Sequence, residues 1–160
     1  MLRHTLATLA YRAGKVLRDA PPEFQAFRPS EGGRSAGQIL AHMGDLMDWS
    51  VSIVERKEAW KDSNAQAWAA DVQRFFDGLA RFDGCLADPP AADAQRASDR
   101  PAAEHVRLFQ GPVADALTHV GQLAMLRRMA GAPIRGENYF KADITPGRVG
   151  LDQAPPKREH

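Results

Sequence analysis

The sequence predicts an all-α fold: a four-helix bundle with a long crossover connection and an irregular C-terminal tail. In four stretches, apolar residues recur every three or four positions, which is the spacing of an amphipathic helix. Proline and glycine separate these stretches, and none shows the apolar–polar alternation of a strand. Four such helices, each of about 16–25 residues, can bury their apolar faces against one another. We expect one domain over residues 1–151 and a flexible end over 152–160.

The first two predicted helices have clear boundary signals. The first covers residues 2–19 and stops at Pro21-Pro22. A polar linker over 28–34 follows, and Ser35-Ala-Gly-Gln38 then has the pattern of a capping box. The second helix is expected to run to about Lys57. The long link before it would permit a crossover topology.

The other two helices are predicted over residues 64–86 and from a start between Ala103 and Pro112 to Gly131. Residues 91–103 are expected to form a surface connection between them. The apolar stripe of the last helix includes Val106 and Phe109. Beyond Gly131 we expect an irregular tail that packs through five apolar residues: Ile134, Tyr139, Phe140, Ile144 and Val149.

Composition excludes several classes of function. The chain has 21 basic and 20 acidic side chains, so its net charge of +1 argues against a nucleic-acid partner. No apolar run approaches the length of about 20 residues needed to cross a membrane. Tyr11, Arg12 and Lys15 interrupt any signal-peptide core, and the single cysteine, Cys85, cannot form an internal disulfide. We therefore expect a cytoplasmic protein.

Three polar residues occupy positions where the helical pattern calls for apolar ones. His42 lies in the apolar stripe of the second helix, and His119 lies in that of the fourth. Asp115 precedes His119 by four residues, so both side chains project from one helix face. Burying a carboxylate beside histidines is costly unless a cation lies between them. The three residues therefore predict a site for one divalent metal ion with open coordination positions.

Two simpler interpretations remain open for these residues. A lone histidine in an apolar stripe is often a hydrogen-bonded core residue, and Asp115 with His119 could form an ordinary ion pair on the helix surface.

Two residues near these three in the sequence could support a metal site. Gln122, three residues after His119, could hydrogen-bond a ligand, or it could be an exposed polar residue. Asp45 could orient His42, or it could be a solvated carboxylate on the flank of the helix.

Two phrases of the sequence resemble the DinB-like superfamily. Gly-Gln-Ile-Leu-Ala-His42 is similar to the phrase that carries a histidine on its second helix. His119-Val-Gly-Gln122 is similar to the phrase that follows the second of two histidines on its last helix. The resemblance implies a metal held by His42, Asp115 and His119, with Asp115 standing where the superfamily usually has another histidine. A carboxylate is a competent ligand there and makes the site one charge more negative.

The resemblance also implies a class of chemistry. Members with known activity look like metal-dependent transferases and isomerases that handle low-molecular-weight thiols, so we expect a metal-dependent enzyme, a transferase or a hydrolase. Zn²⁺ and Ni²⁺ are the leading ions, with Fe²⁺ and Mn²⁺ as alternatives. A non-catalytic metal- or ligand-binding protein is the alternative function. The aromatic content favours a homodimer.

Overall fold

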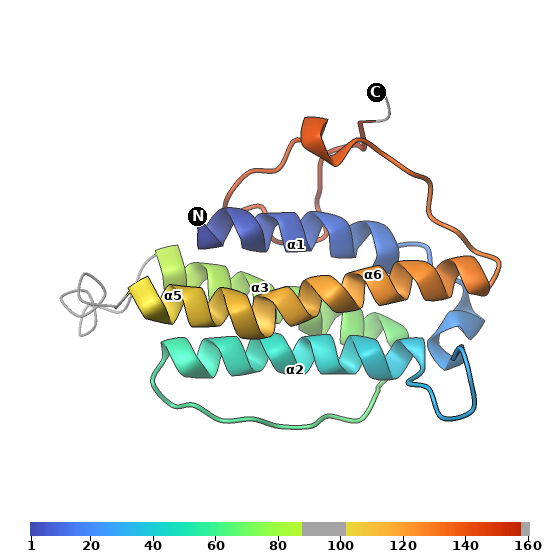
Figure 1. The fold of residues 1–160 in the computed structure, drawn as a ribbon, viewed down its shortest axis with the longest axis horizontal. Helices are drawn as coiled ribbons and strands as arrows, with labels where there is room; N and C mark the ends of the chain where they lie inside the picture. The colour runs from blue at the N-terminus through green and yellow to red at the C-terminus, as the bar shows by residue number, and fades with distance from the viewer. Residues whose placement is uncertain (88–101, 158–160) are drawn as a thin grey trace.

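In the computed structural model, residues 1–87 and 102–157 are described, and within them all regular structure is helical, with no strand. Most of the surface connection predicted over 91–103 lies outside these residues. The α-helices are α1 (Leu2–Leu17), α2 (Ala36–Val54), α3 (Trp68–Ala87), α5 (Ala102–Leu108) and α6 (Ala114–Met129), and the last two form one segment through η2 (Figure 1). Three short helical turns complete the set: η1 (Pro22–Ala26), η2 (Phe109–Val113) and η3 (Tyr139–Lys141).

Hydrogen bonds between side chains and the backbone fix where α2 and α3 begin. The predicted capping box at the start of α2 is confirmed: Ser35 Oγ accepts from Gln38 N at 3.2 Å, and Gln38 Oε1 accepts from Ser35 N at 2.8 Å. The helix ends at Val54, before the predicted Lys57, because Arg56 takes a left-handed φ of 58° that a helix cannot continue. The third helix begins at Trp68, four residues later than predicted, where Trp68 N donates to Gln25 Oε1 at 3.0 Å.

The directions of the helices place a connection that returns along the bundle after α2. In Figure 1, α1 and the α5–α6 segment run one way along the molecule, whereas α2 and α3 run the other way. The link over residues 18–35 therefore joins two oppositely directed helices. Residues 55–67 instead return along the length of α2 so that α3 can run parallel to it (Figure 1).

A π-helical turn, η2, interrupts the last helix at Pro112. Proline has no N–H and its ring clashes with the preceding turn, so one extra residue is accommodated there. The extra residue rotates the preceding turns, so Leu108 and Val113 are buried while Val106 and Phe109 are exposed. The prediction that Val106 and Phe109 belong to the apolar stripe is therefore wrong. The helix also starts at Ala102, one residue before the predicted interval.

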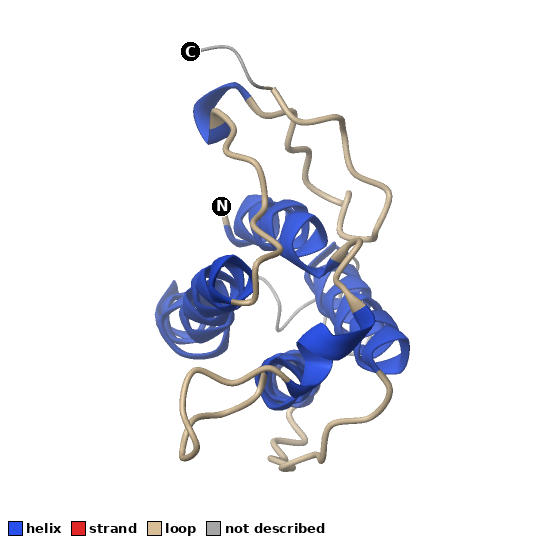
Figure 2. Ribbon diagram, turned by 90° about the vertical axis from the view of Figure 1, so that its right-hand side faces the viewer, coloured by secondary structure: helices blue, strands red, loops and turns tan. Residues whose placement is uncertain are grey.

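The core lies between the four long helical segments, which Figure 2 shows nearly end-on. Its largest fully buried side chains come from α1, η1, α2, α3 and the last helix. They include Leu6, Phe24, Leu40, Met43, Met47, Phe75, Leu79, Phe82 and Leu123. Burying such side chains is the main favourable term for this fold, at roughly 25 cal/mol per Å² of apolar surface removed from water.

The tail after α6 is irregular, as predicted, and lies outside α1 (Figures 1 and 2). It is held by an ion pair between Lys15 Nζ and Glu137 Oε2 at 2.7 Å, and by burial of Val149. The Arg12 guanidinium lies 4.1 Å from the centre of the Tyr139 ring. Phe140, predicted to pack, is instead 98% exposed because the η3 turn directs it away from the core.

Tyr11, which lies where the tail packs against α1, should make the stability of the fold depend on pH. Burial, followed by the nearby Glu137 carboxylate, raises the pKa of Tyr11 to about 12 from an ordinary value of 10.0. Between pH 10 and 12 the unfolded chain loses this proton while the folded chain keeps it, so stability should fall through that interval, by on the order of 2 kcal/mol. Absorbance at 295 nm should show a tyrosine transition near pH 12 that disappears in Tyr11→Phe. A tyrosine signal complete by pH 11 would contradict this account.

Candidate metal centre

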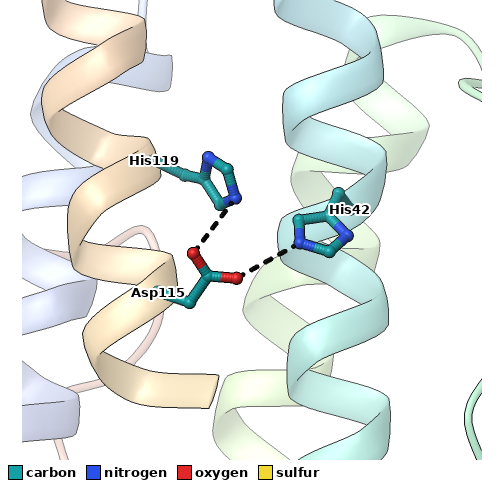
Figure 3. A group of neighbouring side chains, drawn as sticks. All are labelled: His42, Asp115 and His119. Carbon is teal, nitrogen blue, oxygen red and sulfur yellow. Dashed lines mark hydrogen bonds and ion pairs between the residues drawn. The ribbon is translucent and has the colours of Figure 1, made fainter. Parts of the chain in front are cut away.

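His42, Asp115 and His119 meet where α2 passes α6. Each offers one ligand atom, and these atoms all lie within 4.8 Å of one another. Asp115 stands between the two imidazoles: its Oδ2 lies 3.3 Å from His42 Nε2 and its Oδ1 lies 3.4 Å from His119 Nε2 (Figure 3). The two rings are perpendicular, with centroids 5.0 Å apart. The structure thus brings together the three residues that the sequence singled out.

Local helix geometry explains this convergence. Asp115 and His119 are one turn apart on α6, so their side chains share a face. His42 lies near the middle of α2, between the buried residues Ala41 and Met43. On α6, the buried Ala116 directly follows Asp115, and the buried Val120 directly follows His119. Packing of these apolar neighbours fixes both helices, so the polar side chains are held at their contact edge.

The three side chains differ in exposure. The side chain of His119 is 9% exposed and that of His42 is 19% exposed, whereas that of Asp115 is 46% exposed. The expected burial cost therefore applies to the imidazoles and not to the carboxylate, which corrects the premise drawn from the helical pattern. Asp115 faces water at the edge of the site, so a small molecule can approach the group without opening the core.

Gln122 determines which nitrogen of His119 is available. Its Oε1 lies 2.7 Å from His119 Nδ1, so Nδ1 carries the proton and donates it. The lone pair of His119 is then on Nε2, facing Asp115 Oδ1 at 3.4 Å. A lone pair and a carboxylate oxygen repel each other unless a cation lies between them. The imidazole is therefore set in the tautomer that a metal ligand requires.

The separations of the ligand atoms also suit a tetrahedral ion. Imidazole and carboxylate atoms bound to Zn²⁺ at about 2.0–2.1 Å lie about 3.3 Å from one another. The distances from the imidazoles to Asp115, 3.3 Å to Oδ2 and 3.4 Å to Oδ1, are close to this value. Three protein ligands leave at least one coordination position for water or substrate, which is typical of catalytic rather than structural sites.

Removal of the Gln122 amide should weaken metal binding without removing a ligand. In Gln122→Ala, His119 loses the acceptor that fixes its tautomer, and we expect zinc affinity to fall by about 10- to 100-fold. A competition titration against a chromophoric chelator measures this change. Thr118→Ala is the matched control, because Thr118 is exposed on the same helix and its hydroxyl only bonds Ala114 O at 2.9 Å. Equal affinities in the two variants would show that Gln122 has no such role.

Asp45 lies close in sequence to His42 but is committed to other partners. Asp45 is buried, not solvated on the flank, and its Oδ1 accepts from Arg74 Nη2. Its Oδ2 accepts from Ser63 N at 2.9 Å. Both bonds tie α2 to α3 and to the 55–67 connection, and neither reaches His42. Asp45 therefore supports the site only by holding the segments around it.

Trp60 is a neighbour of the site that the sequence did not indicate. Its ring meets that of His42 edge to face, with centroids 5.6 Å apart, and it meets Trp49 at the same distance. Trp60 lies in the irregular 55–67 segment, where no periodicity predicts which side chain lies against α2. Trp49 on α2 is half-buried beside it.

Comparison with protein-family models, curated proteins and solved structures finds no match to this chain. Among the described residues, no helix is both long and apolar enough to cross a membrane. A function for the chain has to be inferred from its own side chains, and His42, Asp115 and His119 are the described group that could hold a metal ion.

Proposed function

We propose that this chain is a divalent-metal-dependent enzyme of the DinB-like type, a four-helix bundle with a crossover connection whose metal ligands are His42, Asp115 and His119. The observation that supports it most is the convergence of the three ligand atoms within 4.8 Å at the edge of α2 and α6. Zn²⁺ and Ni²⁺ suit two imidazoles and a carboxylate best, and Fe²⁺ and Mn²⁺ are alternatives.

The substrate that this site suits is a low-molecular-weight thiol or a small thiol conjugate. A divalent ion bound here supplies a positive charge that lowers the pKa of a coordinated thiol and makes it a nucleophile at neutral pH. Gln122 orients His119 through its 2.7 Å contact, and the exposed Asp115 leaves the site open to solvent. Trp60 covers one side of His42.

The proposal is tested with thiols and a carbon electrophile. The zinc- or nickel-loaded chain is offered glutathione, cysteine or 2-mercaptoethanol together with an alkyl halide, so that the thiol loses its proton and forms an S–C bond as halide leaves. We expect metal-dependent thiol consumption for at least one thiol, abolished in His42→Ala and in His119→Ala. Consumption at the uncatalysed rate for every thiol in this panel would count against transferase chemistry.

The alternative is a non-catalytic protein in which the ion stabilises the fold. It is favoured by the position of the ligands, because an ion here would link α2 to α6 and bind only the folded chain. A large fall in melting temperature on chelation, with no turnover, would support this alternative. A DNA-binding role, suggested only by the name of the superfamily, is disfavoured by the net charge of +1. The homodimer remains a prediction that light scattering can test.

A further inference from the structure

A hollow of about 470 Å³ opens directly beside the candidate metal centre. His119 and Gln122 form part of its wall, so whatever occupies it lies against a proposed ligand. The rest of the wall is mostly apolar and comes from the start of α2, the end of α6 and the linker before α2. It includes Ile39, Met125 and Met129, and Arg34 supplies its charge.

Two methionines near the end of α6 are exposed to solvent. Met125 and Met129 are each 53% exposed and lie one turn apart on α6. Leaving two such side chains in water costs free energy that a bound apolar group would recover. Methionine is flexible and polarizable, so this wall can adapt to an alkyl or aryl chain.

Arg34 is the charged side chain in the wall of this hollow. It also lines a second hollow of about 280 Å³, which contains His42. Arg34 is exposed and makes no hydrogen bond or ion pair within the described parts of the chain.

The two acidic residues that line the second hollow with Arg34 make their hydrogen bonds elsewhere. Asp62 accepts from Trp60 Nε1 at 3.1 Å, and Asp45 is bound to Arg74 and to Ser63 N. Arg34 pairs with neither of these carboxylates, so its guanidinium is available to an anion from solution. A guanidinium favours planar, bidentate anions such as carboxylate.

We propose that this hollow binds the organic part of the substrate, and that the substrate is a small organic acid. Its carboxylate pairs with Arg34, its apolar chain lies on Met125 and Met129, and its metal-binding atom would reach an ion held by His119. The proposal rests on the proposed function and adds to it the class of substrate. Along α2 the rise from Ala36 to His42 is about 9 Å, which sets the six-carbon length of the probes used to test the proposal.

The test uses two pairs of probes that differ only in their charge. The zinc-loaded chain is titrated with 6-mercaptohexanoate and with 6-mercapto-1-hexanol, and the metal-free chain is titrated with hexanoate and with 1-hexanol. Two-dimensional NMR spectra report the dissociation constants in both cases. We expect each acid to bind about fivefold more tightly than its alcohol, the size of one partly exposed ion pair.

Arginine variants assign that preference to one residue. Arg34→Met should abolish the preference for the acids, and Arg34→Lys should keep part of it. Arg28→Met, which removes an exposed arginine from the same linker outside both hollows, should leave it unchanged. Equal affinity for acid and alcohol in the wild type, or an equal loss in Arg28→Met, would overturn the proposal.

The two pairs of probes also separate this proposal from the proposed function. If the chain takes up no zinc, the metal-dependent function fails, yet the metal-free titration still shows whether Arg34 selects hexanoate. If zinc binds and neither acid is preferred, the proposed function stands and the organic-acid proposal fails.

Discussion

Replacing His119 with alanine should release the metal ion from the protein. The His119 side chain is 9% exposed and donates through Nδ1 to Gln122, so its Nε2 is the best-fixed ligand atom of the group. Structural zinc sites with four ligands are worth roughly 10–16 kcal/mol, or about 3 kcal/mol for each ligand. We therefore expect zinc affinity to fall by on the order of 100-fold. Competition with a chromophoric chelator measures the change directly.

Other histidine and aspartate variants determine whether the effect belongs to the site. His42→Ala should show the same loss, whereas His105→Ala should not, because His105 is exposed on α5. Asp115→Asn removes the charge and should also weaken binding. Asp115→His replaces the carboxylate with an imidazole, the ligand usual at this position in the superfamily that the sequence resembles. This variant should therefore retain metal binding. If His119→Ala and His105→Ala bind zinc equally well, His119 is not a ligand.

Replacing Arg127 with methionine should cause the largest loss of stability expected for a single change near the end of α6. Burial lowers the pKa of Arg127, yet its guanidinium remains charged and lies among backbone carbonyls. It donates to Val16 O at 2.9 Å, Arg18 O at 2.8 Å, Asp19 O at 3.1 Å and Ala132 O at 3.0 Å. These bonds join the C-terminal ends of α1 and α6. Leaving such acceptors unpaired should cost about 3 kcal/mol.

Urea unfolding of matched variants tests this role of Arg127. Arg128→Met is the control, since Arg128 is the adjacent residue and is exposed, so its loss should change the free energy of unfolding by less than about 0.5 kcal/mol. Arg127→Lys keeps the charge but cannot reach all four carbonyls, and it should fall between the two. Equal stability of Arg127→Met and Arg128→Met would show that these hydrogen bonds make no net contribution to the free energy of unfolding.

The helices could be predicted from the sequence because their signals are local. The capping box at Ser35 and the apolar spacing of α1 and α3 depend only on neighbours within a few residues. The register before Pro112 could not be predicted, because the π turn that exposes Val106 and Phe109 depends on how the last helix packs. The burial of Arg127 could not be predicted either, because it depends on the approach of the α1 C-terminus.

The candidate site could also be predicted from the sequence only in part. His42 and His119 interrupt apolar stripes, and Asp115 is set by its four-residue spacing, so all three could be singled out in advance. Their convergence depends on how α2 and α6 pack, which spacing cannot give. The exposure of Asp115, the Trp60 contact with His42 and the pairing of Asp45 with Arg74 all depend on contacts between distant segments. No short-range pattern encodes them.

The central claim is that His42, Asp115 and His119 form a metal site, and a zinc titration of the wild-type chain tests it most directly. The metal-free protein is titrated with Zn²⁺ and with Ni²⁺ while bound metal is counted by elemental analysis after gel filtration. We predict saturation at about one ion per chain, with loss of that ion in His42→Ala and His119→Ala. A wild-type chain that retains neither ion would contradict the claim, and the three side chains would then be a hydrogen-bonded cluster.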